Sequence, residues 1–247
     1  MSDPFVTKNI LKWYDLNKRS LPWRKNVSKE KRQYNTLISE FMLQQTQVAT
    51  VIPYFNKFVK EIPNIKKLAS VDNKKLIKLW EGLGYYSRAR NLKKAAQSVI
   101  KNFNGVIPDN FDDLKSLSGI GDYTANAILA IAFNKPYIPL DGNVERIIKR
   151  YLYLKKEKEI QKENLIEKKS ILGFSNRSSD YAQALMEFGA LVCKPTNPLC
   201  YQCPITKKCK SFKKKDFNLT KNSKKYKDKY FLLKVYKKDQ KYLLIKN

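Results

Sequence analysis

The sequence predicts an all-α protein, and two observations carry the prediction. Apolar residues recur at helical spacing from residue 5 to about residue 135, and no run that alternates apolar and polar residues occurs before the C-terminal tail. The composition is that of a folded globular protein, since 43% of the 247 residues are hydrophobic and 29% are charged. A chain of this length can form one large domain or two small ones.

Four helices follow directly from the spacing of apolar residues. The positions that predict them are Leu37, Ile38, Phe41 and Met42; Val48, Val51 and Ile52; Leu92, Ala95, Ala96 and Val99; and Ala125, Ile128, Leu129 and Ile131. Proline interrupts the helical hydrogen-bond ladder, so helix breaks are expected at or near five prolines. These are Pro22, Pro53, Pro63, Pro108 and Pro136.

The composition changes from Lys210 onward, where 14 Lys and only 3 Asp occur before the chain ends. Residues 211–229 are predicted to be a basic, solvated linker. Tyr230–Tyr236 and Tyr242–Ile245 are predicted strands around a turn at Lys237–Gln240. An isolated hairpin is marginal in water, so residues 230–247 are expected to be the first hairpin of an incomplete C-terminal β-containing domain, in a fragment or a naturally truncated product.

The charge of the chain favours a polyanionic partner. Fifty Lys and Arg against 22 Asp and Glu give a net charge of +28, which suits DNA or RNA, although biased codon usage could also produce it. The chain has no histidine. This absence excludes Ser–His–Asp and Cys–His catalysis and His-ligated zinc, and it leaves acid–base chemistry to Asp, Glu, Tyr or Lys.

No membrane partner is expected. No stretch reaches the roughly 18–20 apolar residues that span a bilayer, and the N-terminus lacks the apolar core of a secretory signal. A cytoplasmic protein is the expectation.

All four cysteines lie within 17 positions, in the pattern C-x6-C-x2-C-x5-C. Disulfides are disfavoured in a cytosolic protein, and structural zinc sites usually use two short Cys-x2-Cys knuckles rather than one. The spacing favours iron–sulfur ligation modestly over zinc. The four residues are Cys193, Cys200, Cys203 and Cys209.

A glycine turn precedes the apolar helix at residues 125–133. Gly119 and Gly121 are expected to permit positive φ angles, and the N–H groups at the following helix N-terminus can bind phosphate. Such a hairpin grips DNA without reading bases, although an ordinary helix corner with a glycine cap would have the same pattern. Asp141 follows, and it could equally cap the next helix.

Six segments together resemble the helix-hairpin-helix DNA glycosylase superfamily, and within it the MutY-type adenine DNA glycosylases. They are Arg19–Arg24 (RSLPWR), Ser39–Val48 (SEFMLQQTQV), Gly82–Leu92 (GLGYYSRARNL), Leu117–Ile128 (LSGIGDYTANAI), Leu140–Ile147 (LDGNVERI) and Ala184–Cys193 (ALMEFGALVC). The resemblance implies two helical domains with DNA and a flipped base between them. One is a six-helix barrel with the hairpin (25–136), and the other holds a 4Fe–4S cluster on the four cysteines (1–24 and 137–210).

The resemblance also implies a reaction, the hydrolysis of the bond between adenine and deoxyribose. Glu40 looks like the general acid that protonates the base, and its place on an apolar helix suggests a raised pKa. Asp141 looks like the carboxylate that stabilises the positive sugar, with Asn143 orienting it. Tyr123 stands where lyase relatives carry a nucleophilic lysine, so strand cleavage by that route is not expected. A purely structural aromatic remains the alternative for Tyr123.

Further residues resemble DNA contacts of the family. Gln45 and Tyr85 look like wedges into the base stack, with Gln44 as an alternative to Gln45 and loop packing as an alternative to both. The adenine pocket is expected to use Arg19, Trp23, Leu43 and Gln183, although Arg19 could contact phosphate and Trp23 could be a core anchor. Arg88, Gly119 and Gly121 complete the expected DNA contacts.

Two departures from the family pattern qualify these expectations. Ser118 replaces a usual proline, and Asp122 lies where a basic residue is more usual, which should weaken the phosphate contact slightly. The family's C-terminal domain, which inspects oxidised guanine, is represented only by its opening hairpin. A preference for 8-oxoguanine opposite the adenine is therefore in doubt.

The expected partner is double-stranded DNA with adenine mispaired with 8-oxoguanine or guanine, bound by a monomer of a bacterial-type, nucleoid-associated protein. Rival interpretations are a thymine–guanine mismatch glycosylase, an endonuclease III-like glycosylase, and a non-catalytic DNA-binding relative. Glu40 and the absence of lysine at Tyr123 argue against the pyrimidine-specific rivals.

Overall fold

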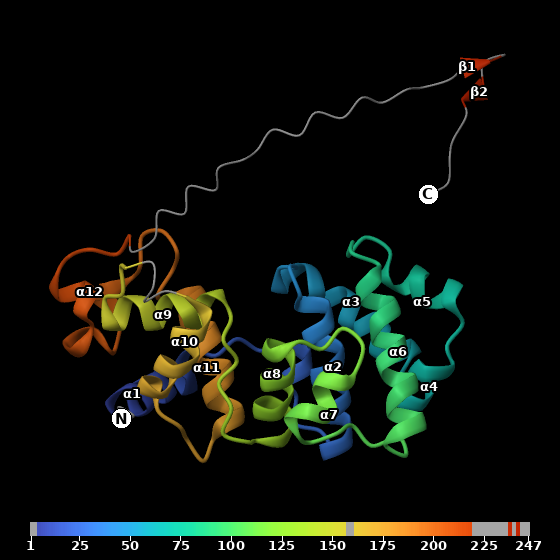
Figure 1. Ribbon diagram of the computed structural model, residues 1–247, viewed down its shortest axis with the longest axis horizontal. Helices are drawn as coiled ribbons and strands as arrows, with labels where there is room; N and C mark the ends of the chain where they lie inside the picture. Colours follow the sequence, from blue (N-terminus) through green and yellow to red (C-terminus); the bar gives the residue numbers. More distant parts are fainter. Residues whose placement is uncertain (1–3, 157–160, 219–236, 239–240, 243–247) are drawn as a thin grey trace.

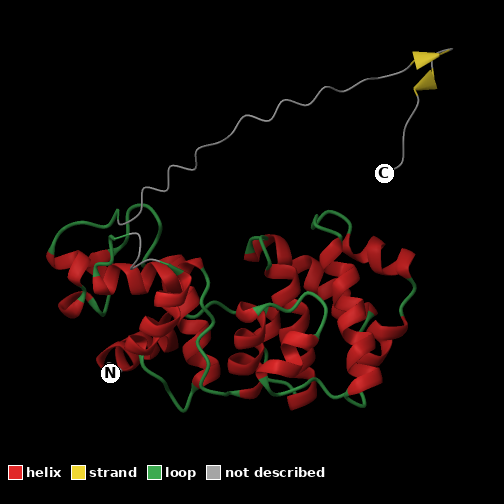
Figure 2. Cartoon of the chain, viewed as in Figure 1, coloured by secondary structure: helices red, strands yellow, loops and turns green. Residues whose placement is uncertain are grey.

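The computed structural model describes residues 4–156, 161–218, 237–238 and 241–242. Helix dominates the described residues (Figure 2), which confirms the all-α prediction. The larger helices are α1 (Pro4–Asn17), α2 (Lys29–Leu43), α3 (Val48–Glu61), α4 (Ile65–Ser70), α5 (Asn73–Trp80), α6 (Ser87–Asn102), α7 (Phe111–Ser116), α8 (Asp122–Phe133), α9 (Gly142–Leu152), α10 (Lys162–Lys168) and α11 (Ser178–Leu191). Shorter elements are η1 (Pro22–Arg24), η3 (Lys169–Leu172), η4 (Cys200–Gln202), η5 (Thr206–Lys208) and α12 (Lys210–Lys213).

Helices α2–α8 enclose one hydrophobic core and form what we call the first lobe (Figure 1). The large buried side chains at its centre include Phe41, Phe58 and Trp80, and the rings of Phe58 and Trp80 meet edge to face at 6.1 Å. Helix α2 runs through this core and buries ten consecutive residues, from Gln33 to Met42. Several residues of this run are polar, but Glu40 is the one that carries a carboxyl group, whose burial is costly unless it is neutral or paired.

Helices α1, α9, α10 and α11 share a second core and form the second lobe, at the other end of the molecule in Figure 1. The N-terminal helix α1 packs along α11, where Trp13 and Phe188 meet edge to face at 5.3 Å. Residues far apart in the chain therefore build one lobe. The two cores contain residues from the two expected domains, and the exact limits of those domains stay predictions.

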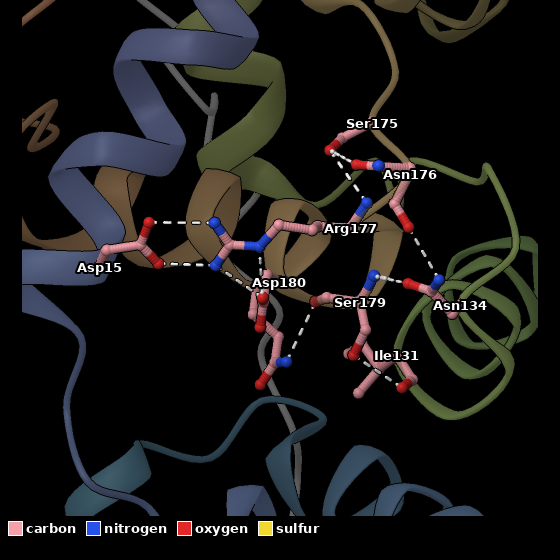
Figure 3. Close-up of polar contacts among 9 residues, drawn as sticks. Asp15, Ile131, Asn134, Ser175, Asn176, Arg177, Ser179 and Asp180 are labelled. Carbon is pink, nitrogen blue, oxygen red and sulfur yellow. Dashed lines mark hydrogen bonds and ion pairs between the residues drawn. The ribbon is translucent and has the colours of Figure 1, made fainter.

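The lobes meet where α8 packs against α11 (Figure 3). Asn134 ends α8 in a left-handed conformation (φ 54°), donates to the Asn176 carbonyl at 2.8 Å and accepts from the Ser179 N–H at 2.9 Å. Arg177 beside it bridges Asp15 of α1 and Asp180 of α11. These contacts fix α11 against both α8 and α1.

One expected helix break is wrong. Pro53 lies inside α3 rather than at its end. Proline removes the bond to the carbonyl four residues earlier, and here that residue, Ala49, is exposed near the start of the helix. Water can therefore replace the missing donor.

The C-terminal predictions also need correction. The described part of the predicted linker, residues 211–218, keeps most of its side chains exposed but is attached to the second lobe. Ser211 is fully buried, Asp216 accepts a hydrogen bond from Tyr153 at 3.0 Å, and the Phe217 carbonyl accepts one from Arg150 at 3.1 Å. The high lysine content of this segment obscured Phe212 and Phe217, which face the cysteine region.

Strand pairing in the tail is shifted from the prediction. Strands β1 (Lys237–Lys238) and β2 (Lys241–Tyr242) pair Lys237 with Tyr242 and Lys238 with Lys241, so the predicted turn residues Lys237 and Lys238 belong to a strand. Period-two patterning alone does not fix the register of a short hairpin or the position of its turn. The predicted strand residues 230–236 and 243–245 lie outside the described residues. Across the described helices, none has the length and apolar character to cross a membrane.

Candidate active site

A cavity of about 220 Å³ lies between the lobes and brings together eight of the predicted site residues. These are Arg19, Trp23, Glu40, Leu43, Tyr123, Asp141, Asn143 and Gln183. They come from η1 and the loop before it, α2, α8, α9 and its N-cap, and α11, so no single segment of the sequence makes the site. Its size suits a single nucleobase rather than a drug-sized ligand, for which pockets of roughly 300–1,000 Å³ are usual.

Glu40 is a buried acid poised to titrate near neutral pH. It is 5% exposed, and its Oε2 has no hydrogen-bond partner among the described residues. Burial raises the pKa of Glu40 to about 7, and the negative charge of Asp141 adds to the rise, while Tyr123 and Arg24 oppose it. A carboxylic acid with this pKa can hold a proton at physiological pH and release it to a substrate.

Asp141 combines the two roles that its sequence position left open. It caps α9, since its Oδ1 accepts from the Val144 N–H at 2.7 Å, and it also lines the cavity. Asn143 Nδ2 donates to Asp141 Oδ2 at 2.8 Å. Burial raises the pKa of Asp141, but the hydrogen bonds from Val144 and Asn143 oppose the rise, so its charged form is better supported than that of Glu40.

Tyr123 lies in the first turn of α8 and faces both carboxylates. Burial raises the pKa of its hydroxyl well above the usual value, and the charges of Glu40 and Asp141 add to the effect. The hydroxyl donates to Met186 Sδ at 3.4 Å. Tyr123 therefore stays protonated and can only donate or accept hydrogen bonds here.

The sequence reasoning missed a buried ion-pair cluster that forms one wall of the cavity. Glu187 of α11 has a fully buried side chain, and its Oε1 accepts from the backbone N–H and Nε of Arg19 at 2.7 and 3.1 Å. Arg24 Nη1 donates to Glu187 Oε2 and to the Arg19 carbonyl. The signal was present in the sequence as an acid inside the apolar run of α11, because a buried charge requires a partner.

Three pocket residues also have structural roles. Trp23 stacks edge to face on Phe55 at 5.3 Å, so the wall and the core-anchor interpretations both apply. Gln183 donates through Nε2 to the Ser179 carbonyl, which leaves its Oε1 available to the cavity. Arg19 is engaged by Glu187 and is not a free surface cation.

The carboxylate site is linked to the cysteine loop through Arg146. Its Nη2 donates to Asn143 Oδ1 at 2.7 Å, and its Nε donates to the Cys193 carbonyl at 2.7 Å. Since Asn143 in turn holds Asp141, one guanidinium ties the orientation of that carboxylate to the backbone of the loop.

Gln44, Gln45 and Tyr85 lie outside the cavity. Gln44 is half-buried and donates to Thr124 at 3.4 Å, whereas Gln45 is exposed. Tyr85 is 63% exposed in the loop before α6. Gln44 is therefore the more enclosed of the two glutamines, and the choice between them as a DNA contact stays a prediction.

Arg88, expected to contact DNA, is instead 7% exposed, and its guanidinium is occupied by backbone carbonyls. The expectation came from the family resemblance of this segment, which carries no information about burial. Burial removes Arg88 from that surface.

The glycine turn differs from the prediction at one position. Gly119 has φ +82°, and a Cβ there would lie 2.9 Å from Phe41 Cε1 and Asn91 Cβ, so glycine is required. Gly121 has φ −95° and caps α8 on the surface, where an added Cβ would meet nothing within 4 Å. Its contribution is open access to the helix N-terminus. Asp122 pairs with Lys115 on this surface.

The four cysteines line one cavity with apolar neighbours, among them Ile147, Phe188 and Phe217. No three His, Cys, Asp or Glu side chains of the described residues converge closely enough to hold a single metal ion. Four thiols around one cavity, with Arg150 Nη1 donating to Cys193 Sγ at 3.4 Å, form a donor set that can hold a cysteine-bound metal centre.

Comparison with known proteins gives consistent similarities. The family profile of the HhH-GPD superfamily of base excision DNA repair proteins matches residues 38–172. An adenine DNA glycosylase of Buchnera aphidicola subsp. Baizongia pistaciae is 42% identical over 209 residues, which are 83% of this chain and 58% of that protein. The human adenine DNA glycosylase is 40% identical over 214 residues, which are 82% of this chain and 38% of that protein.

A solved thermostable thymine-DNA glycosylase has the same fold, with a TM-score of 0.74 and 27% identity over 84% of this chain and 95% of that one. A trapped endonuclease III–DNA intermediate, at 23% identity and a TM-score of 0.68, supports the fold alone. The chain spans about three fifths or less of these two curated relatives.

Proposed function

The chain belongs to the HhH-GPD superfamily of base excision DNA repair proteins, and we propose that it is a monofunctional DNA glycosylase that releases adenine mispaired with 8-oxoguanine or guanine. One observation carries the proposal. A buried acid with a pKa near 7 and a second, hydrogen-bonded carboxylate face one base-sized cavity. Environments that separate the protonation states of two carboxyl groups are the mark of acid and stabiliser roles.

The reaction begins with a nucleotide turned out of the duplex, because the target bond cannot be reached inside the stack. Adenine enters the cavity, where Trp23 and Leu43 supply apolar walls. Gln183 Oε1 offers a hydrogen-bond acceptor to the polar edge of adenine. The Arg19–Glu187 ion pair offers fixed charges to the same edge. The hydrogen bonds from Arg19 and Arg24 hold the Glu187 carboxylate in place, where it can accept a further hydrogen bond from the amino group of adenine.

Glu40 then donates its proton to the imidazole-side nitrogen of adenine, which converts a poor leaving group into a better one. Glu40 lines the cavity, so its carboxyl group lies beside a base that enters it. As the base departs, positive charge develops on the sugar, and Asp141 stabilises it electrostatically or through a transient covalent bond. Water then adds to the sugar carbon, and the proton that it loses restores the protonated Glu40. Asn143 keeps the Asp141 carboxylate charged and correctly oriented.

Tyr123 supports the absence of lyase chemistry. A phenol has no amine nitrogen, so Tyr123 cannot form the Schiff base by which a lysine attacks the sugar. We propose that Tyr123 instead maintains the hydrogen-bonding environment of Glu40.

The DNA is held by the surface around the cavity. The open N-terminus of α8 after the glycine turn offers backbone N–H groups to phosphate, and Gln45 and Tyr85 form a wedge pair that fills the space left by the flipped nucleotide. This grip is independent of sequence and draws on the net charge of +28. We propose that the protein acts on DNA as a monomer, in the compartment that contains the chromosome.

The four cysteines are proposed to hold a 4Fe–4S cluster. Such a cluster supplies structural cross-linking of the loop, and through Arg146 the loop positions Asn143 and Asp141. The residues that would hold it are Cys193, Cys200, Cys203 and Cys209.

The test is incubation with duplexes that carry adenine opposite 8-oxoguanine, adenine opposite guanine, or thymine opposite guanine, followed by alkali. Alkali-dependent breaks at adenine alone support the proposal, and borohydride should trap no protein–DNA adduct. Release of thymine would favour the activity for which the structurally similar thymine-DNA glycosylase is named. If no base is released from any duplex, the remaining interpretation is a DNA-binding relative that lacks this activity.

A further inference from the structure

The guanidinium of Arg88 holds two loops at once. Its Nη1 donates to the carbonyls of Phe41, Met42 and Gln44 at the end of α2, with 3.2 and 2.8 Å to the first two. Its Nη2 donates to the carbonyls of Leu83 and Gly84 at 2.9 and 3.2 Å. One side chain thus joins the chain before Gln45 to the chain before Tyr85.

Both residues that follow these carbonyls adopt unusual backbone conformations. Gln45 has φ 55° and Tyr85 has φ 46°, in the left-handed region that side chains with a Cβ rarely occupy. Such strain persists only where surrounding contacts determine it, and it concentrates at functional sites. The Arg88 guanidinium also lies 5.6 Å from the centre of the Tyr85 ring.

The two strained residues are also exposed, while the group that fixes them is buried. Tyr85 is 63% exposed and Gln45 is exposed, yet Arg88 is 7% exposed. The loops therefore present two side chains to solvent from a rigid base. An arrangement that rigidifies exposed side chains before binding lowers the entropy lost when they engage a ligand.

We propose that Arg88 is a positioning residue that presets Gln45 and Tyr85 as one unit, so that both enter the base stack together. The inference rests on the proposed function, because the wedge acts only on a duplex whose base is to be turned out. Arg88 would act through Gln45 and Tyr85 and would not contact DNA itself.

Lysine cannot replace arginine in this role. The guanidinium is a planar fork whose two Nη atoms point to the two loops separately, whereas an ammonium is one donor atom on a flexible stem. Arg88→Lys keeps the positive charge and most of the buried stem but can hold only one of the two loops. The two wedge residues should then lose their fixed spacing.

The same guanidinium binds the end of α2, which carries Glu40, so a loss of activity alone would not separate the wedge from the acid. A fluorescent base makes the distinction. With 2-aminopurine beside the target adenine, the rise in fluorescence on binding reports unstacking and is independent of the chemical step. The experiment compares the parent chain, Arg88→Lys and Arg90→Lys, an exposed neighbour on the same helix.

We expect Arg88→Lys to lower both the fluorescence rise and single-turnover adenine release, the latter by roughly 10- to 100-fold, the range for loss of one base–aromatic stack. Arg90→Lys should change neither. Tyr85→Ala should slow the parent by a similar factor but slow the Arg88→Lys chain less than about threefold, because the wedge is already lost.

Thermal denaturation without DNA checks that each variant is folded, and the fluorescence rise is read at saturating protein. A normal fluorescence rise in Arg88→Lys with slow release would place the damage at Glu40 and overturn the proposal. An undiminished cost of Tyr85→Ala in the Arg88→Lys chain would overturn it as well. If the parent unstacks the base but releases no adenine, the proposed function fails. The role of Arg88 is then still decided by the fluorescence rise of Arg88→Lys, Tyr85→Ala and the double variant.

Discussion

At the scale of single residues, the environments of Glu40 and Asp141 explain how two carboxyl groups in one cavity can do opposite work. Glu40 has no partner for Oε2 among the described residues and a pKa of about 7. Asp141 accepts from a backbone N–H and an amide, which support its charged form. The difference follows from desolvation on one side and hydrogen bonding on the other.

The raised pKa of Glu40 predicts that the difference in unfolding free energy between the parent and Glu40→Gln depends on pH. The folded protein binds this proton more tightly than the unfolded chain, so stability is lost as pH rises from the ordinary 4.5 through about 7. Since each pKa unit corresponds to about 1.4 kcal/mol, Glu40→Gln should gain on the order of 3 kcal/mol over the parent above pH 7 and little below pH 4.5. Denaturant unfolding across this range measures the difference, and a pH-independent gap would contradict it.

Glu187 predicts a larger structural effect. Glu187→Gln leaves Arg19 and Arg24 facing a neutral group in a buried cluster, and breaking such a cluster typically costs about 3–5 kcal/mol. Because Arg19 is 36% exposed, solvent screens part of the loss, so we expect about 2–3 kcal/mol.

Glu163→Gln on α10 is the control, since Glu163 is exposed and such surface changes usually stay within about 0.5 kcal/mol. Equal unfolding free energies for the Glu187 and Glu163 variants would show that the buried cluster does not stabilise the fold.

The site was partly predictable from these residues. Sequence segments located Glu40, Tyr123, Asp141 and Asn143, all of which the structure brings to one cavity. Glu187 was missed because its partners lie more than 160 positions away in the sequence. Long-range ion pairs leave no periodic signal, and only the improbability of an acid in an apolar helix pointed to it.

At the scale of elements, the glycine turn before α8 provides a matched pair of variants. Gly119→Ala places a side chain at φ +82° and 2.9 Å from Phe41 and Asn91, so a loss of roughly 1–2 kcal/mol from backbone conformation alone is expected, and the close contacts add to it. Gly121→Ala meets nothing within 4 Å and has an ordinary φ.

Thermal melting should therefore separate the two alanines, with only Gly119→Ala clearly destabilised. Comparable melting temperatures would mean that the turn relaxes and that Gly119 is not required by its conformation.

The cysteine loop predicts a metal content. Purified protein should contain iron and acid-labile sulfide and show broad visible absorbance, and Cys203→Ser should lose most of the iron because a hydroxyl is a poor ligand for this group. Elemental analysis with stoichiometric zinc and no iron would instead support a zinc site on the same four residues.

Elements with strong apolar periodicity were predictable, and α2, α3, α6 and α8 lie where the spacing put them. The helix break predicted at Pro53 was wrong because this proline lies near the start of α3, where the loss of one hydrogen bond does not end the helix. The C-terminal segment misled because Phe212 and Phe217 pack back on the cysteine region despite many lysines around them. Both errors come from contacts that local composition does not encode.

At the scale of the whole molecule, the site exists because two lobes meet. Helix α2 of the first lobe brings Glu40, while α9 and α11 of the second bring Asp141 and Glu187 (Figure 1). The junction around Asn134 and Ser179 fixes α11 against α8, so contacts beside the cavity set the distance across it (Figure 3). The sequence resemblance implied this arrangement, but composition and periodicity alone did not.

The most direct test of the account is single-turnover adenine release by Glu40→Gln and by Asp141→Asn. Both variants keep the volume of the side chain, and asparagine still caps a helix. We predict that each loses roughly 100- to 10,000-fold in rate, the range for a positioned acid or base, while DNA affinity changes little. Adenine release by either variant at a rate within a few fold of the parent would contradict the account.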